Sequence, residues 1–298
     1  MIYLTGFADE ASDHIEGQVK AIQTLGWSHI ELRAVNGTNI TDISDDEFEH
    51  VARYLDANDI AVNAFGSTIC NWGKSILEPM DKDLAEIERA IPRMKALGTK
   101  YIRIMSYAVL KDRDMSDQLV DERIDRVRRV VDRFGEEGLE ALHENCANYG
   151  GMGWRYTLEL VEKIPGLRLI FDTANPATTV DRKKPGETVT LSSWEFYENV
   201  RPHIAHVHIK DGRFLRDNPD SVFEDADYVW PGEGDGEVKR IVSDLFATGY
   251  DGGLSIEPHL SVVFHGEIQA ASEQARFDSF VEYGKRLEQI VNDIRSTP

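Results

Sequence analysis

The stretch IAHVHIKD at residues 204–211 is an apolar run that carries groups able to bind a metal ion. Continuous Val, Ile and Leu runs are typical of parallel strands that are buried on both faces. Three other runs end in a carboxylate: LEALHEN at 139–145, LRLIFDT at 167–173 and GGLSIEP at 252–258. Since an unpaired buried charge is costly, we expect these four exceptions to share one partner, which a divalent cation would supply.

The alternation of short apolar runs and amphipathic stretches continues along the whole chain. The predicted strands are residues 2–6, 29–33, 60–66, 101–107, 139–145, 167–173, 204–211 and 252–258, each followed by a helical pattern. This is the count of a closed α/β barrel, the (β/α)8 TIM barrel, in which the carboxyl ends of the strands meet at one mouth. A doubly wound open sheet is the alternative, but GFADEASDH at 6–14 is not a glycine-rich dinucleotide fingerprint.

The chain has 298 residues, a length at which α/β barrels form a single domain. No linker or low-complexity tract divides it, so we expect one domain over residues 1–298. Two predicted loops, 176–192 and 212–235, are unusually long. Both follow strands that carry the metal-binding groups, and long loops in compact domains are usually functional. We therefore expect both loops to lie over the mouth of the barrel.

The composition restricts the possible partners. With 33 basic and 53 acidic residues the formal net charge is -20, which repels nucleic acid and anionic membranes. No apolar run approaches the roughly 20 residues that a membrane helix needs. Two cysteines, Cys70 and Cys146, cannot build a disulfide framework, and no base pattern accompanies Cys146, so we expect a spectator thiol and a reduced cytoplasmic setting. MIYLTGFADE at the N-terminus does not have the pattern of a signal peptide.

Several short motifs together resemble one known family. They are GWSHIELR at 26–33, HEN at 143–145, FDTAN at 171–175, HVHIKD at 206–211, PGEGDGE at 231–237 and SIEPH at 255–259. In this order they resemble the sugar phosphate isomerase/epimerase family, the xylose isomerase-like TIM barrels that include ketose 3-epimerases, inosose dehydratase and endonuclease IV. Each motif alone is weak, whereas the set covers nearly the whole chain. The resemblance indicates a superfamily and a metal site, and does not identify a substrate.

The resemblance implies one divalent metal ion held by Glu144, Asp172, His208 and Glu257. Manganese is the first expectation, with Mg²⁺, Co²⁺ or Zn²⁺ as alternatives, and the donor chemistry agrees, because three carboxylates and one imidazole form a mostly hard oxygen site. His208 is chosen over His206 because the family's ligand is the histidine that is separated by one residue from a Lys-Asp pair. For His206, packing is preferred to a role behind the metal ligands.

The resemblance also implies a proton-transfer mechanism on a small sugar. The metal would bind a carbonyl and the adjacent hydroxyl and stabilise a cis-enediolate. Glu144 and Glu257 would be the catalytic pair, one as general base and the other as general acid. Their pKa values should then differ, one lowered by the metal and one raised by burial. Relatives of this kind are often homodimers or homotetramers.

Further residues are predicted to contact the substrate. Arg213 matches a substrate-contacting arginine of related epimerases, with a surface loop arginine as the alternative. Asn175 stands where relatives often have histidine, and His259 has the same strand parity as Glu257. Lys210 would contact substrate, pair with Asp211 or support the metal ligands from behind. Trp72 would stack on a sugar ring or cap a loop. The candidates are therefore Arg213, Asn175, His259, Lys210 and Trp72.

Three other functions compete with epimerisation or isomerisation. An inosose dehydratase-like lyase would use the same four ligands, and nothing in the sequence separates it. An endonuclease IV-like phosphodiesterase needs more ligands, but the third and fourth strands end in Asn63, Phe65, Ser106 and Tyr107, and the net charge opposes DNA binding. A non-enzymatic barrel has no use for two metal-bound carboxylates. GEGDG at 232–236 resembles a phosphate-binding loop only loosely and is better read as a turn of a lid.

Overall fold

The computed structural model describes residues 2–181, 189–215, 226–260 and 272–296. Eight parallel strands form one sheet, in the spatial order β1 (Tyr3–Gly6), β12 (Gly253–Ile256), β9 (Ile204–Ile209), β8 (Arg168–Asp172), β7 (Glu140–Glu144), β6 (Tyr101–Ile104), β5 (Ala61–Phe65) and β2 (His29–Leu32). The sheet curls into a nearly closed barrel, so the predicted TIM barrel is confirmed.

The ring of strands closes between β1 and β2. These strands share an isolated parallel bridge between Phe7 and Glu31. By contrast, β1 and β12 pair over four residues, from Tyr3 opposite Gly253 to Gly6 opposite Ile256. We call the β1–β2 junction the seam of the barrel.

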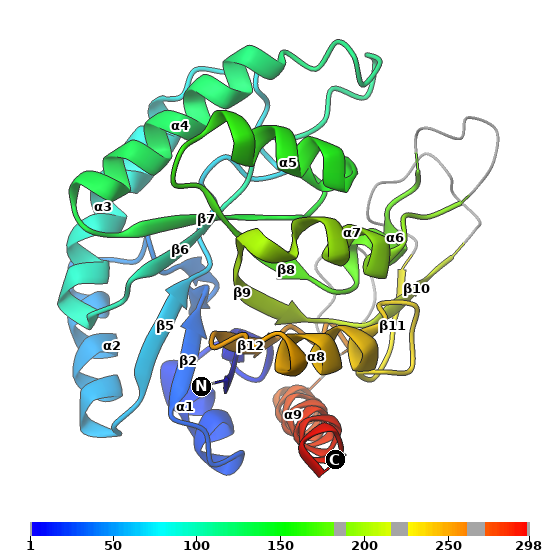
Figure 1. Cartoon of the computed structure of the whole chain (residues 1–298). Coiled ribbons are helices and arrows are strands. Elements are labelled where there is room, and N and C mark those ends of the chain that lie inside the picture. The colour runs from blue at the N-terminus through cyan, green and yellow to red at the C-terminus, as the bar shows by residue number, and fades with distance from the viewer. Residues whose placement is uncertain (1, 182–188, 216–225, 261–271, 297–298) are drawn as a thin grey trace.

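Helices cover the outside of the strands (Figure 1). They are α1 (Ile15–Thr24), α2 (Asp45–Ala57), α3 (Asp81–Leu97), α4 (Val120–Glu136), α5 (Trp154–Lys163), α6 (Asn175–Thr178), α7 (Ser193–Val200), α8 (Val238–Ala247) and α9 (Glu273–Ser296). In α4 the buried residues Ile124, Val127, Val130 and Phe134 recur at three- and four-residue intervals, which places one apolar stripe against the sheet. Among the described helices, none is long and apolar enough to cross a membrane.

The long predicted loops contain more structure than the sequence indicated. The segment after β8 begins with α6. Further along the same segment, an isolated antiparallel β-bridge joins Val180 and Thr190. The segment after β9 contains an antiparallel hairpin of β10 (Gly212–Phe214) and β11 (Ala226–Tyr228). A smaller hairpin, β3 (Ala34–Val35) with β4 (Thr38–Asn39), follows β2. Residues 182–188 and 216–225 of the two loops lie outside the described part. The fourth strand ends at Ile104, earlier than predicted, and Tyr107 beyond it has a positive φ of 66°, a conformation that a strand does not adopt.

The inside of the barrel changes from apolar to charged along its axis. Leu142 and Ile170 form a small buried cluster with Ala205, separate from the main core. Side chains two residues apart on a strand face the same side. Glu144 and Asp172 therefore face the same side as Leu142 and Ile170, two residues nearer the carboxyl ends of these strands. The apolar layer is therefore a floor beneath a mouth that is lined with ionisable groups.

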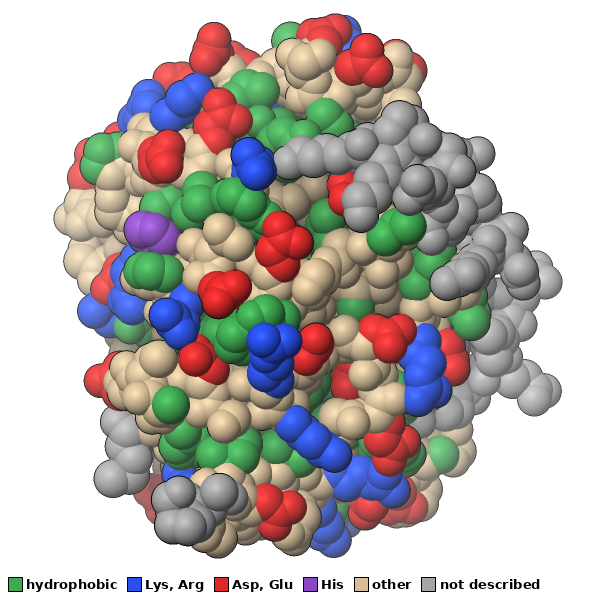
Figure 2. All heavy atoms as spheres, turned by 45° about the vertical axis from the view of Figure 1, so that its right-hand side comes forward, with side chains coloured by type: hydrophobic (Ala, Val, Ile, Leu, Met, Phe, Trp, Pro, Cys, Tyr) green, Lys and Arg blue, Asp and Glu red, His purple; other side chains and the backbone are tan. Residues whose placement is uncertain are grey.

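The outer surface carries both signs of charge. On the face drawn in Figure 2, lysines and arginines are interspersed with acidic and hydrophobic side chains.

Candidate metal centre

Four predicted ligands converge at the carboxyl ends of neighbouring strands. Glu144 ends β7, Asp172 ends β8, His208 lies in β9, and Glu257 directly follows β12. All four side chains are buried, and one ligand atom from each lies within 4.8 Å of the others. The arrangement follows from the barrel, because residues far apart in sequence occupy the same level of adjacent strands. We call these residues the quartet.

Two oxygens of the quartet are poorly satisfied by the protein itself. Glu144 Oε2 and Asp172 Oδ2 are buried and accept no hydrogen bond from the described residues. The other Asp172 oxygen accepts backbone N–H groups from Ala174 at 2.9 Å and Asn175 at 2.7 Å, which fixes the carboxylate. Buried carboxylate oxygens are unfavourable without a cation beside them, which a basic side chain or a metal ion can supply. Together with the imidazole of His208, they form a donor set that fits a hard divalent ion.

Three basic side chains also contact the quartet. Lys210 Nζ lies 3.1 Å from Asp172 Oδ2 and 3.2 Å from Glu257 Oε2. Arg33 reaches Glu257 Oε1 at 2.8 Å, and Arg103 reaches Glu144 Oε2 at 3.3 Å. The Lys210 ammonium therefore contacts the same oxygens that a metal ion would use.

Sequence reasoning missed Arg33 and Arg103. Both belong to predicted strands, HIELR and YIRIM, and both are largely buried, with side chains 12% and 10% exposed. Charged residues inside apolar runs were the signal used for the quartet, and the same signal would have found these two arginines.

The surrounding charges set the protonation of the carboxylates. Burial raises the pKa of Glu257, but Lys210, His259 and Arg33 outweigh it and hold the pKa well below its usual range. Burial likewise raises the pKa of Glu144, and Arg103 with His208 outweighs it, so the pKa is lowered. One of the two catalytic candidates was predicted to have a raised pKa. With the protein's own charges alone, neither of them does. The raised pKa belongs to Asp172, where burial outweighs the attraction of Lys210.

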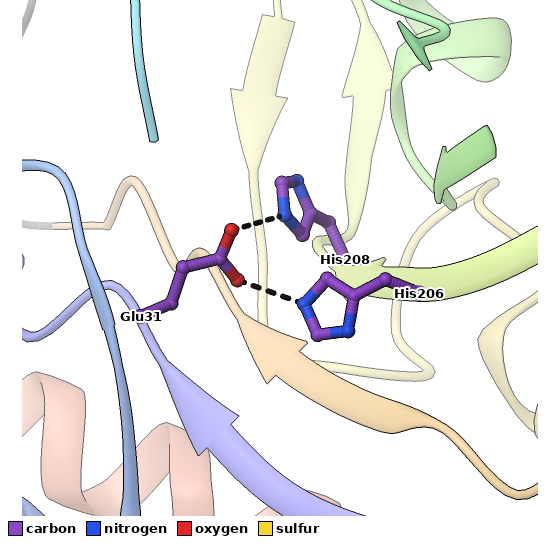
Figure 3. A group of neighbouring side chains, drawn as sticks. All are labelled: Glu31, His206 and His208. Carbon is purple, nitrogen blue, oxygen red and sulfur yellow. Dashed lines mark hydrogen bonds and ion pairs between the residues drawn. The ribbon is translucent and has the colours of Figure 1, made fainter. Parts of the chain in front are cut away.

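His208 is held between two carboxylates. Its Nδ1 lies 3.2 Å from Glu144 Oε1, and its Nε2 lies 3.1 Å from Glu31 Oε1. Burial lowers the pKa of His208, but Glu31 and Glu144 outweigh it and raise the pKa to about 10. His206 was expected to pack, whereas its Nε2 lies 2.8 Å from the second oxygen of Glu31. Figure 3 shows Glu31 reaching both imidazoles.

The predicted substrate contacts are distributed unevenly around the quartet. His259 lies close to it, with Nε2 at 3.7 Å from Glu257 Oε1 and Nδ1 at 2.8 Å from Glu10 Oε1. Asn175 is buried beside Asp172, and its Nδ2 has no hydrogen-bond partner among the described residues. Arg213 is exposed on β10 and donates to the backbone carbonyl of Glu233. Trp72 is 36% exposed between β5 and α3, outside the contacts that define the quartet.

The glycine-rich turn binds a carboxylate of the protein itself. Asp211 accepts backbone N–H groups from Gly232 at 2.8 Å, Gly234 at 3.0 Å and Gly236 at 2.9 Å. A Cβ atom on Gly234 would lie 2.3 Å from Asp211 Oδ1, so the turn needs glycine to approach this closely. The turn is thus a cradle for Asp211. Lys210 is paired with Asp172 and Glu257 of the quartet, which corrects the predicted pair of Lys210 with Asp211.

Tyr228 at the end of β11 brings the second long loop to the site. Its ring lies edge-on to His259, with centroids 5.0 Å apart, and Lys210 Nζ lies 6.0 Å from its centroid. Burial raises the pKa of Tyr228 to about 12. The hairpin therefore brings a phenol next to Lys210 and His259.

Two residues beside the quartet are spectators in this arrangement. Burial raises the pKa of the Cys146 thiol, which opposes thiolate chemistry. His143 has the opposite strand parity to Glu144, and its Nε2 lies 3.0 Å from both Ser106 Oγ and Asn148 Oδ1. Burial lowers the pKa of His143 to about 4, so the ring is neutral at physiological pH.

Solved structures with the same fold include enzymes and metal-binding proteins. The probable 3-DHS dehydratase AsbF from Bacillus anthracis has a TM-score of 0.67 and 19% identity, over 97% of this chain and 99% of that chain. A D-tagatose 3-epimerase-like protein has a TM-score of 0.70 and 14% identity, over 98% of both chains. The IOLI protein, solved with a binding zinc atom, has a TM-score of 0.69 and 16% identity, over 99% of this chain and 100% of that chain.

The sequence comparisons are consistent with a distant relationship. Among curated protein sequences, none is significantly similar to this one. The family model for xylose isomerase-like TIM barrels matches residues 19–278. Because this match spans most of the chain, the protein belongs to the xylose isomerase-like TIM barrel family.

Proposed function

We propose that the chain is a divalent metal-dependent isomerase or epimerase of a sugar or keto-sugar. The observation that carries the proposal is the quartet, in which four buried donors from four strands converge and two carboxylate oxygens accept no hydrogen bond from the part of the chain that the structure describes. Glu144, Asp172, His208 and Glu257 would hold one ion, with Mn²⁺ as the first candidate. The likeness to the D-tagatose 3-epimerase-like protein supports the reaction class, and the zinc atom of the IOLI protein supports a divalent ion.

The bound ion would polarise a substrate carbonyl and stabilise the negative charge that develops when the neighbouring carbon loses its proton. Glu144 and Glu257 supply the proton transfers. Both carboxylates are ionised near neutral pH among the protein's own charges, so either can accept a proton from carbon. For epimerisation the other carboxylate would first take up a proton from solvent and then deliver it to the opposite face of the carbon. For isomerisation the carboxylate that accepted the proton would return it to the adjacent carbon, while the hydroxyl proton passes to the former carbonyl oxygen.

The basic and amide groups around the pair orient the substrate. Lys210 and Arg103 contact the acidic pair and would donate to substrate oxygens as the ion takes their place on the carboxylates. Asn175 offers a buried N–H group for which the described residues provide no acceptor. His259, with a side chain 13% exposed, lies next to Glu257 and would exchange its proton with solvent. Arg213 and Trp72, further out, would contact the distal part of the sugar.

A dehydratase is the second candidate, and the likeness to the probable 3-DHS dehydratase favours it. The first step would be the same proton abstraction, after which the hydroxyl on the β carbon would leave as water. A phosphodiesterase receives less support. It would need further metal ligands at the ends of β5 and β6, and the candidate metal clusters among the described residues contain no residue of these two strands.

The first experiment combines metal analysis with isotope exchange. Wild-type chain, Glu257→Gln and Asp172→Asn are loaded with Mn²⁺, freed of excess ion and subjected to elemental analysis. The matched control is Glu140→Gln, at the opposite end of β7, where Glu140 pairs with Lys100 and Arg168. We expect about one ion per chain in wild type and control, and less in both quartet variants.

The loaded proteins are then incubated with a panel of keto-sugars in D₂O. Deuterium on the carbon next to the carbonyl supports the proposal, and an accompanying enone absorbance assigns the lyase. If wild-type chain loaded with Zn²⁺ instead of Mn²⁺ takes up two or three ions, phosphodiester hydrolysis would be favoured. If no ion is taken up from excess Mn²⁺, Mg²⁺, Co²⁺ or Zn²⁺, the metal centre is wrong.

A further inference from the structure

Glu31 lies beneath the quartet and contacts two imidazoles at once. Its two carboxylate oxygens lie 3.1 Å from His208 Nε2 and 2.8 Å from His206 Nε2. All three side chains are completely buried. The contacts cross the barrel, because Glu31 is on β2 whereas both histidines are on β9.

The two nitrogens of His208 face different groups. Nδ1 faces the quartet, at 3.2 Å from Glu144 Oε1 and 3.8 Å from Glu257 Oε2, whereas Nε2 faces Glu31. A carboxylate accepts hydrogen bonds and does not donate them when ionised. Both nitrogens of His208 thus face carboxylates. Because an ion held by Glu144 and Glu257 would take the Nδ1 side, the proton of a neutral His208 would then remain on Nε2, where Glu31 accepts it, with the Nδ1 lone pair directed at the quartet.

The position of the Glu31 carboxylate is itself fixed. Its backbone pairs with Ala64 of β5 on one side and bridges Phe7 on the other. Phe7 also packs edge-on against the His208 ring, with centroids 5.0 Å apart. The imidazole is thus held by a hydrogen bond at one edge and by an aromatic side chain nearby.

We propose that Glu31 is a positioning residue that selects Nδ1 of His208 as the metal-binding nitrogen. This inference rests on the metal centre proposed above. A carboxylate behind a histidine ligand fixes the tautomer and makes the imidazole a stronger donor. Glu31 does not touch the ion or the substrate, and His206 occupies its second oxygen without serving the metal.

The inference predicts which nitrogen is ligated, and this can be measured without a mutation. Chain labelled with ¹⁵N on histidine is titrated with Zn²⁺, a diamagnetic probe, and the ring nitrogens are observed by two-bond ¹H–¹⁵N correlation. The His208 signals are assigned by their loss in His208→Asn. We expect the Nδ1 resonance to move on loading while Nε2 retains its proton. Ligation through Nε2 would overturn the proposal.

Variants separate positioning from a merely structural role. Glu31→Gln is expected to weaken Zn²⁺ binding by about 10–100-fold in a chelator competition assay. The matched control His206→Gln retains an N–H donor for the other oxygen of Glu31, so its affinity should stay within about threefold of wild type. Thermal unfolding of both metal-free variants reports any structural loss, which we expect to be similar in the two.

The outcomes also distinguish this inference from the proposed function. If wild-type chain binds no ion, the metal centre itself fails. If wild type binds and Glu31→Gln binds equally well, the positioning role fails while the function stands. Two ions per chain, one of them lost in His206→Gln, would make Glu31, His206 and His208 a second metal site and overturn the positioning role.

Discussion

His208 Nδ1 and Glu144 Oε1, two proposed metal ligands, lie 3.2 Å apart in hydrogen-bonding contact. With the pKa of His208 raised to about 10, a proton is shared in this pair at neutral pH. A metal ion needs the lone pair of Nδ1, so binding has to displace that proton.

We therefore expect metal binding at pH 7–8 to release about one proton per ion, and the apparent affinity to rise about tenfold per pH unit up to about pH 10. Isothermal titration calorimetry in buffers of different ionisation enthalpy measures the number released. An equal heat in all buffers would contradict the assignment of His208 as a protonated ligand.

Arg123 predicts a large loss of stability at a site remote from the quartet. Its completely buried guanidinium donates to four backbone carbonyls, including Gln118 at 2.6 Å and Ala108 at 2.8 Å. Arg123→Met leaves these acceptors unsatisfied and should lower the free energy of unfolding by about 3 kcal/mol or more. Arg128→Met, on the same helix, removes one exposed bond to Lys163 and should cost less than about 1 kcal/mol. Chemical denaturation of both variants measures the difference. Equal losses would contradict a stabilising role for the four hydrogen bonds of Arg123.

The cradle around Asp211 predicts that its glycines cannot be enlarged. In Gly234→Ala the new Cβ would lie 2.3 Å from Asp211 Oδ1 and 2.7 Å from Gly212 N, so the turn must move. We expect a loss of about 1–3 kcal/mol. Gly135→Ala, in α4, should instead be neutral or stabilising by up to about 1 kcal/mol, because among the described residues the added Cβ would meet no atom within 4 Å beyond its chain neighbours and its own helix backbone. Melting temperatures of the pair test this, and a neutral Gly234→Ala would show that Asp211 does not need the close approach.

His143 predicts an acid-dependent part of the stability. Burial lowers its folded-state pKa to about 4, against about 6.5 for an unfolded histidine. Between these values the unfolded chain binds more protons, so the contribution is complete above pH 6.5 and is lost as the pH falls to 4. The part of the free energy of unfolding that is lost in this way is of order 3 kcal/mol. Denaturant unfolding at pH 7, 5.5 and 4.5 should show a shallower decline for His143→Gln, and parallel declines would refute it.

Most of the fold could be predicted from the sequence, because each strand is a short apolar run with its own boundary. The exceptions lie where a backbone feature has no compositional signal. Residues 105–107, MSY, show no glycine or proline that would end a strand, yet Tyr107 has a positive φ. The β10–β11 hairpin is short and polar at its start, so its pattern is that of a loop.

The site residues that could be predicted are those whose signal lies in their own stretch of sequence. Each quartet residue is an ionisable group at or near the end of an apolar run, which the sequence alone displays. Glu31 and His206 look like ordinary strand residues until they are brought together, 175 positions apart in sequence. Pairings of this kind are set by the register of the closed barrel, which periodicity does not encode.

The seam between β1 and β2 has a consequence for local unfolding. A single bridge joins the strands there, and one of its two residues, Glu31, also reaches across to His208. Transient opening of the seam would withdraw the carboxylate from the imidazole, so occupancy of the quartet and amide-exchange protection at Phe7 should rise and fall together. The weakest junction of the ring would then be the one that bound metal holds shut.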